Sequence, residues 1–208
     1  MKTVIVTIPM IPPEKVNAMR YPIDGNKTME YENPVRYAIN GILAKTLEKG
    51  EPVKVILILT VGENSEYAKN QKAYIEELEK INAEIGAVLS YDTVEIGFLP
   101  TKHTYNKLIT DLAEKIPENA EIYTDITFGF KPETISLFCA FRFAEEFRDA
   151  VVQYIVYGKV EFNKETGKPE HPMLYEITSL YYLFKLMGSM GASNAESAME
   201  TLKDFFAM

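Results

Sequence analysis

The chain has 208 residues, 47% hydrophobic and 25% charged, and its 30 Asp and Glu against 22 Lys and Arg give a net charge of −8. That charge excludes a protein that long DNA or RNA finds through a broadly positive surface, so a nucleotide ligand has to be held locally. The single cysteine, Cys139, excludes an internal disulfide, and two widely separated histidines leave no ligand set for zinc.

These features predict a cytoplasmic protein without a metal, a cofactor or a membrane segment. The apolar runs fall short of the ~20 residues that cross a bilayer. The first run, 3–11, ends in Pro12-Pro13 and predicts a buried strand in place of a signal peptide. Cys139 lies within a helical apolar pattern, which predicts a place in the core.

Apolar β-forming runs alternate with helical patterns along most of the chain. Such alternation is typical of βαβ units. It predicts an α/β fold, a Rossmann-like doubly wound and mostly parallel sheet with helices on both faces. The expected strands are 3–11, 53–60, 92–99, 121–127 and 151–157, and the expected helices are 34–49, 65–82, 105–116 and 132–147.

An insertion over 12–33 separates the first strand from the first helix. Asp24-Gly25-Asn26, flanked by β-forming residues, predicts a β-hairpin within it. A segment placed after the first strand overhangs the carboxyl edge of the sheet, where it can shape a pocket or remain a surface feature. We favour the pocket.

The last part of the chain predicts helices. After the fifth strand, residues 159–162 suggest a short hairpin strand, followed by a polar loop over 163–172. Helices are expected over 174–190 and 195–206, and the first carries apolar residues on more than one face. We therefore divide the chain into a domain over 1–172 and a C-terminal helical segment over 173–208, which needs covering by its own domain, a second subunit or a further domain.

The fourth strand runs into a distinctive segment, Asp125-Ile126-Thr127-Phe128-Gly129-Phe130-Lys131. Pro132 then opens a helix, where its missing N–H costs nothing. N–H groups at such a junction point outward with the positive end of the helix dipole, and Lys131 adds a charge, so the segment suits an anion. An ordinary loop with a structural glycine is the alternative. We expect Asp125 to hold the loop through hydrogen bonds.

This segment resembles the Asp-Ile-Thr-His-Gly-Phe-Arg signature of the CRISPR-associated Rossmann fold (CARF) family. Two further stretches, 154–158 and 59–64, resemble the family's next strand and its second strand-to-helix junction more weakly. Phe128 stands where the family has His, and Lys131 replaces Arg, so a two-pronged phosphate contact becomes a point charge.

The resemblance implies a sensor that binds a cyclic oligoadenylate in type III CRISPR antiviral signalling. It implies a homodimer, because a ring of two-fold symmetry such as the tetra-adenylate matches a two-fold axis. The signal would pass to an effector domain or partner beyond the C-terminal helices, 173–208.

A doubly wound strand order of 3-2-1-4-5 places the ligand where the order reverses, at the carboxyl ends of the first and fourth strands. The strand order and the family resemblance thus both indicate the carboxyl ends of the first and fourth strands as the binding site. Phe128 or Phe130 could stack on adenine, with core packing as the alternative for both, and for Phe130 we favour core packing. We expect only a minor role for Glu63. The predicted ligand-binding residues are Thr7, Ile8, Pro9, Met10, Thr60, Gly62, Glu63, Thr127, Phe128, Gly129, Phe130 and Lys131.

A second hypothesis is a ring nuclease that cleaves the bound ring without a metal, by aligning a ribose 2′-OH for in-line attack. Thr127 and Lys131 are the candidate catalytic residues. Phe128, in place of the family's His, removes an obvious general base, so we favour a sensor without catalysis of its own. A transcription regulator is disfavoured because no basic helix-turn-helix is evident.

Overall fold

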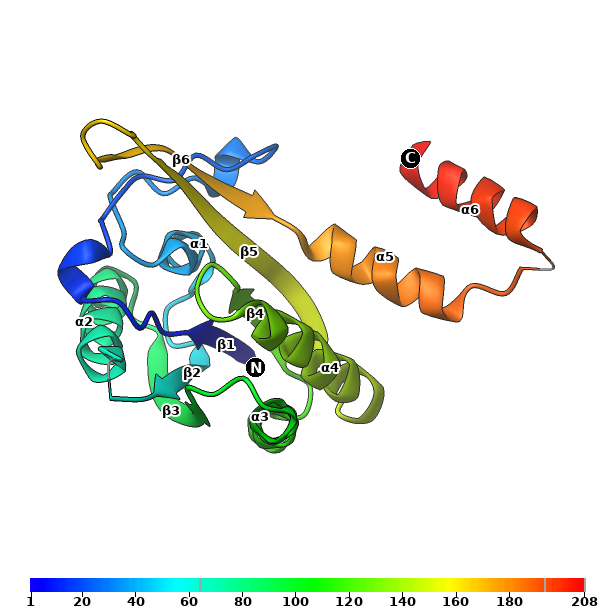
Figure 1. Ribbon diagram of the computed structural model, residues 1–208, viewed down its shortest axis with the longest axis horizontal. Coiled ribbons are helices and arrows are strands. Elements are labelled where there is room, and N and C mark those ends of the chain that lie inside the picture. Colours follow the sequence, from blue (N-terminus) through cyan, green and yellow to red (C-terminus); the bar gives the residue numbers. More distant parts are fainter. Residues whose placement is uncertain (64, 193, 208) are drawn as a thin grey trace. The chain divides into compact units, whose positions relative to one another are not determined.

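The computed structural model describes residues 1–63, 65–192 and 194–207 (Figure 1). The chain divides into two compact units, Met1–Ile177 and Thr178–Met208. The sequence analysis placed its division after residue 172. None of the helices described is long and apolar enough to cross a membrane.

The first unit is built on one six-stranded sheet with the order β3-β2-β1-β4-β5-β6. Neighbouring strands from β3 to β5 pair in parallel, and β6 adds an antiparallel edge. The predicted α/β class and the order 3-2-1-4-5 are both confirmed. The strands are β1 (Lys2–Thr7), β2 (Pro52–Val61), β3 (Val88–Gly97), β4 (Glu121–Asp125), β5 (Val151–Phe162) and β6 (Pro169–Glu176).

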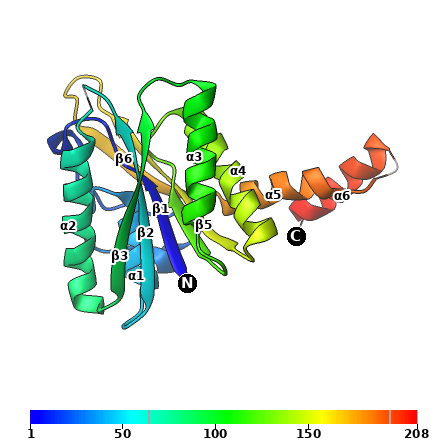
Figure 2. The same cartoon turned by 90° about the horizontal axis from the view of Figure 1, so that it is seen from below.

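Two helices cover each face of this sheet. Helices α1 (Ala38–Thr46) and α2 (Tyr67–Ile85) lie on one face, and α3 (Lys102–Lys115) and α4 (Lys131–Phe147) lie on the other (Figure 2). Every residue of β1 is buried, as expected for a central strand covered on both sides. The second unit contains α5 (Thr178–Ser189) and α6 (Ala195–Ala207).

The hairpin predicted within 12–33 is wrong. In this fully described stretch the regular structure consists of two short 3-10 turns, Pro13–Lys15 and Lys27–Met29. Asp24-Gly25 does form a turn, but Ile23 before it pairs with Leu174 of β6. Burial favours the observed pairing, because Ile23 joins the hydrophobic core beside Leu174.

The sequence also misplaced the segment after the fifth strand. Residues 159–162 continue β5, and β6 occupies a stretch expected to be loop and helix, so the helix predicted from 174 begins at Thr178. β6 pairs only with β5 in the sheet, and an edge strand tolerates Pro169 because its N–H is not needed by a second neighbour.

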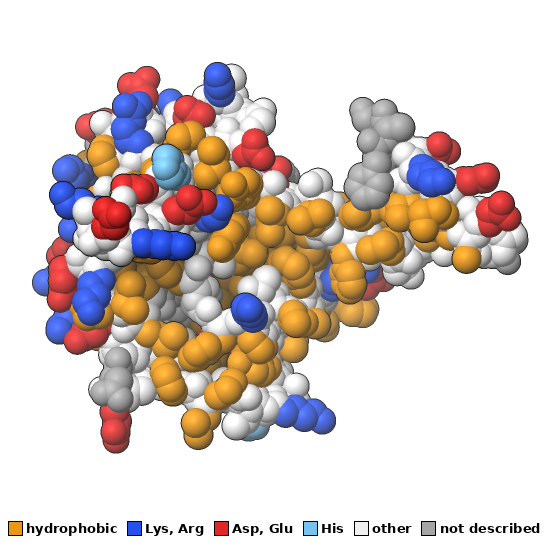
Figure 3. Space-filling model, turned by 45° about the horizontal axis from the view of Figure 1, so that its top comes forward, with side chains coloured by type: hydrophobic (Ala, Val, Ile, Leu, Met, Phe, Trp, Pro, Cys, Tyr) orange, Lys and Arg blue, Asp and Glu red, His pale blue; other side chains and the backbone are white. Residues whose placement is uncertain are grey.

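Helix α4 turns an apolar row to the surface. Ile135, Phe143 and Phe147 are 67%, 41% and 70% exposed. Cys139 lies in the same row and is exposed, so its predicted core position is wrong. Both sides of α4 carry apolar residues, and the sequence pattern does not say which side meets the sheet. Figure 3 shows one face of the molecule, with hydrophobic side chains exposed among charged ones.

Candidate functional site

The strand order reverses between β1 and β4, and the predicted segment follows β4 at that point. Val6 of β1 pairs with Asp125 at the end of β4, so both strands reach the same edge. Thr7 lies against the loop, because a Cβ on Gly129 would lie 2.8 Å from Thr7 Cγ2. The structure therefore brings together the two strand ends that the sequence analysis combined into one crevice. We call residues 125–131 the motif loop.

Asp125 ties the motif loop to helix α1. Its carboxylate accepts the N–H of Thr127 at 2.8 Å and the N–H of Ile39, in the first turn of α1, at 3.3 Å. The side chain is 1% exposed, and burial raises the pKa of Asp125 while these hydrogen bonds act in the opposite direction. The predicted structural role of Asp125 is confirmed.

Thr127 ties the same loop to β5. The N–H of Gly158 donates to Thr127 Oγ1 at 2.7 Å. A Cβ at Gly158 would lie 3.1 Å from both Thr127 Oγ1 and Ala38 Cβ, so glycine allows the loop, β5 and the start of α1 to meet without a small shift of these neighbours. The Thr127 hydroxyl is thus a positioning group in this structure.

Gly129 is the turning point of the motif loop. Its φ of +99° lies in a region that favours glycine. A Cβ here would also overlap the carboxylate of Glu133, in the first turn of α4. Glycine is therefore required both by backbone conformation and by space.

Glu133 is a functional candidate that the sequence analysis missed. The residue is 1% exposed, yet neither carboxylate oxygen has a hydrogen-bond partner among the described residues. Burial raises the pKa of Glu133 to about 7. In sequence, an acidic residue in a first helical turn suggests only a favourable interaction with the helix dipole.

The remaining loop residues are more accessible. Lys131 is exposed at the start of α4, as a ligand contact requires. Phe128 is half-buried and packs against the core on the α1 side. Phe130 is half-buried and meets Phe98 edge to face at 5.6 Å between ring centroids, which supports the predicted packing role.

The residues just after β1 are largely occupied by structure. Ile8 is a core residue at 1% exposure. Pro9 is buried, and its carbonyl accepts a hydrogen bond from the side chain of Asn70 at 2.9 Å. Met10 is half-buried, and its carbonyl accepts the N–H of Glu66 at 3.0 Å. These contacts bind the end of β1 to α2 and leave Ile8 and Pro9 little surface for a ligand.

The predicted residues at the end of β2 differ in access. Thr60 is fully buried, and its hydroxyl has no partner in the described chain. Gly62 is half-buried beneath Phe98, and a Cβ added to Gly62 would lie 3.1 Å from the Cβ of Phe98. Glu63 is exposed in a turn. Asn64, the last residue of the stretch that resembles the family's second junction, lies outside the described residues.

A hollow of about 270 Å³ opens beside the motif loop. The insertion over 12–33 supplies five of its lining residues, so the predicted pocket role of that segment is confirmed in geometry. We call it the insertion hollow. It is lined by Ile11, Lys15, Val16, Asn17, Met19, Tyr21, Arg36, Thr127, Phe128, Tyr157, Gly158, Val160 and Phe162.

A larger hollow, of about 550 Å³, lies between 31–36 and α2. Its lining includes Glu76, Glu77 and Glu84 against Arg36 and Lys80. This excess of acid makes it a poor place for a phosphate. Between the two hollows, the one beside the motif loop suits an anionic ligand better.

No protein-family model matches the chain, and no curated protein resembles it significantly in sequence. Family membership is therefore not shown, and the link to the CARF family rests on the motif loop and its position. Among the described residues, no three His, Cys, Asp or Glu side chains are grouped so that they could hold a metal ion.

Proposed function

We propose that the chain is a sensor of a cyclic oligoadenylate, with the tetra-adenylate first among the rings, in type III CRISPR antiviral signalling. One observation carries the proposal. The N–H groups of Phe128, Gly129 and Lys131 make no hydrogen bond within the part of the chain that the structure describes, whereas the N–H of Phe130 lies close enough to the Glu133 carboxylate to oppose the rise in its pKa. Three free donors around a helix N-terminus are suited to the phosphates of an oligonucleotide.

The surroundings of these donors support an anionic ligand. Lys131 adds a full positive charge at the same helix start, and the α4 N-cap residue, Phe130, provides no side-chain cap. Asp125, the acidic residue of the loop, is buried and hydrogen-bonded on the opposite side, so it does not oppose a phosphate at the surface. Asp125 and Thr127 thus hold the motif loop on the side of α1 and β5, and its free donors remain available for a ligand.

A homodimer completes the proposal. The exposed apolar row of α4, formed by Ile135, Cys139, Phe143 and Phe147, begins one helical turn after the motif loop. Two copies that pair through this row would bring two motif loops to one axis, which suits a ring with two-fold symmetry. A signal would then leave through the C-terminal unit, toward an effector domain or partner.

Isothermal titration against rings of three, four and six adenylates tests the proposal. We expect the tetra-adenylate to bind most tightly, with one ring for two chains. Absence of heat with all three rings, at protein concentrations where the dimer forms, would refute the sensor.

Lys131→Ala should weaken binding of cyclic tetra-adenylate about tenfold or more, because a charge-assisted phosphate contact contributes ~1.5–3 kcal/mol. Its thermal stability should stay unchanged, since Lys131 is exposed and makes no ion pair with a described residue. Lys49→Ala is the matched control, an exposed cation at the opposite edge of the sheet, before β2. An unaltered dissociation constant for Lys131→Ala would remove this side chain from the site.

Glu133 favours a second candidate function, the ring nuclease. A buried carboxyl with a pKa of about 7 is suited to proton transfer near neutral pH, and it lies directly beneath Gly129. Excess cyclic tetra-adenylate incubated with the protein, followed by chromatography, separates the two. Multiple turnover to linear product that Glu133→Gln abolishes would establish cleavage; an intact ring after prolonged incubation would support a sensor alone.

A further inference from the structure

The insertion hollow is a separate compartment next to the donors of the motif loop. We propose that it binds the adenine base and ribose of one adenylate unit, with Arg36 and Lys15 at its rim holding the attached phosphate. This inference rests on the proposed function and assigns the base a hollow, where the sequence suggested only Phe128 or Phe130 as a stacking surface. It also explains why the insertion over 12–33 folds over the carboxyl edge of the sheet.

The size of the hollow limits its occupant. Pockets for drug-sized molecules measure ~300–1,000 Å³. The insertion hollow, at about 270 Å³, lies just below that range and suits a single nucleoside unit, not a whole ring of four. A ring could place one base here only if the rest of it passed over the motif loop, where the free N–H groups are.

The lining offers flat apolar surfaces for a base. Four aromatic side chains line it: Tyr21 from the insertion, Phe128 from the motif loop, and Tyr157 and Phe162 from β5. Phe162 is 59% exposed, an unfavourable position for a large ring unless something covers it. Proteins that bind single strands stack bases on aromatic rings of this kind, whatever the base.

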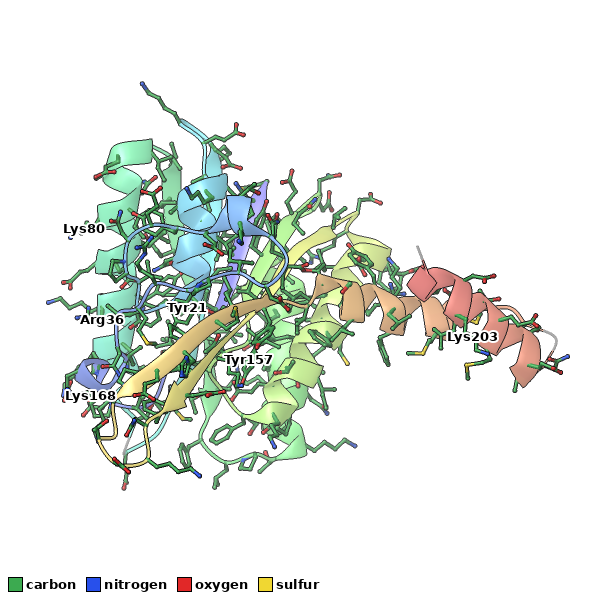
Figure 4. The ribbon with its side chains drawn as sticks, turned by 90° about the horizontal axis from the view of Figure 1, so that it is seen from above. Tyr21, Arg36, Lys80, Tyr157, Lys168 and Lys203 are labelled. Carbon is green, nitrogen blue, oxygen red and sulfur yellow. The ribbon has the colours of Figure 1, made fainter. Side chains whose placement is uncertain are left out.

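Two cations at the rim are available for a phosphate. Lys15 and Arg36 line the hollow, and neither forms an ion pair within the described chain. Arg36 also borders the larger hollow, where the Glu77 carboxylate accepts hydrogen bonds from the N–H groups of Arg36 and Tyr37 and from the side chain of Asn40. In the view of Figure 4, Tyr21 lies between Arg36 and Tyr157.

Asp125 is the acidic group beneath this hollow. It lies near enough to Tyr21 for its charge to contribute to the raised pKa of that residue, after burial. Its carboxylate is turned to the N–H groups of Thr127 and Ile39 and is 1% exposed, so it does not reach the rim where the cations are. The lining thus combines apolar side chains with two cations in a chain of net charge −8.

The motif loop joins the hollow to the donors. Thr127 and Phe128 line the hollow, and the free N–H groups begin at Phe128. A ligand with its base in the hollow and its next phosphate near the loop would therefore contact both. Binding of a base should be measurable with a single nucleotide, without a ring or a second subunit.

Ligand-observed NMR with adenosine monophosphate and ribose 5-phosphate tests this assignment on the full chain. We expect saturation of the adenine protons in adenosine monophosphate, and binding about tenfold weaker for ribose 5-phosphate, which has no base to stack. Arg36→Ala should weaken binding of adenosine monophosphate about tenfold, and Phe162→Leu about fivefold. Lys49→Ala, the cation control, should bind as the unsubstituted protein does.

The outcomes separate this inference from the proposed function. The base site is overturned if the unsubstituted protein and its three variants bind adenosine monophosphate equally. It is also overturned if adenosine monophosphate and ribose 5-phosphate bind equally, or if neither binds at millimolar concentration. Cyclic tetra-adenylate that binds Arg36→Ala and Phe162→Leu with unchanged affinity also overturns it, while the sensor survives. Adenosine monophosphate that binds with the expected dependence, when no ring binds, supports the hollow and refutes the ring sensor.

Discussion

The two sides of the motif loop are built in opposite ways. On the side of α1, Asp125 and Thr127 are fully engaged, with N–H groups from Thr127, Ile39 and Gly158 directed at their oxygens. On the side of α3 and α4, Glu133 is buried without a partner in the described chain. The side of α1 therefore holds the loop in place. On the other side, the burial of a carboxyl without a hydrogen-bond partner is unfavourable for the folded state.

This difference suggests a division of labour. A side with every hydrogen bond made resists movement, because moving it would break several bonds at once. The side with Glu133 gains from any change that supplies a donor or water, so it is the side on which the loop can move when a ligand binds. Tyr105 on α3 also has a buried hydroxyl without a partner in the described chain, and the nearby Glu133 raises the pKa of Tyr105, after burial.

Gly129→Ala should give the largest effect on stability, since the new Cβ would overlap the Glu133 carboxylate and crowd Thr7. We expect the free energy of unfolding to fall by about 3 kcal/mol, from strain at positive φ and from the overlap together. Urea denaturation measures it.

Gly50→Ala is the matched control, because Gly50 also has a positive φ, of 77°, but has nothing within 4 Å of a new Cβ. Its cost should be about 1 kcal/mol, from backbone strain alone. Equal losses for the two variants would show that the space beneath Gly129 is not tight, and would remove the contrast between the two sides of the loop.

Glu133→Gln should change how stability depends on pH. The pKa of Glu133 is raised from its ordinary value of 4.5 to about 7 in the folded state, so between these pH values the folded state holds a proton that the unfolded state has lost. Stability of the unsubstituted protein therefore falls as pH rises from about 4.5 to about 7, by as much as roughly 3 kcal/mol. Glutamine cannot ionise, so the variant should lose this fall.

The measurement is the difference in unfolding free energy between the variant and the unsubstituted protein at pH 5 and pH 8. We expect the difference to shift in favour of Glu133→Gln at the higher pH. Glu118→Gln, at an exposed position, should show the same difference at both values. If Glu133→Gln behaves like this control, the carboxyl is solvated and the two sides of the loop do not differ in the way described.

The comparison also shows what the sequence could predict. The order of the central strands was predictable because continuous apolar runs alternate with helices, a pattern that few arrangements satisfy. The role of Asp125 was predictable because an acidic residue two positions before Thr127 at a strand end favours a local hydrogen bond. Both predictions depend on neighbours in sequence or on a general rule of the fold.

What the sequence could not predict depends on contacts between distant segments. Ile23 pairs with Leu174 across the chain, and that long-range pairing replaced the local hairpin. The burial of Glu133 results from the position of Gly129 over it, which no spacing pattern shows. Arg36 fell within the helix expected over 34–49, and only the folded insertion gives it a hollow to line.

Replacing one side-chain atom of Thr127 should weaken the attachment of the motif loop to β5. Thr127→Val removes the oxygen that accepts the Gly158 N–H at 2.7 Å and keeps a similar shape. We expect a loss of about 1 kcal/mol in unfolding free energy and faster hydrogen exchange at the Gly158 amide, because that donor is left without its partner. Thr127→Ser keeps the acceptor and should restore both values. If instead the valine variant retains full protection at Gly158, another group must hold the loop to β5, and the rigidity assigned to this side would not come from Thr127.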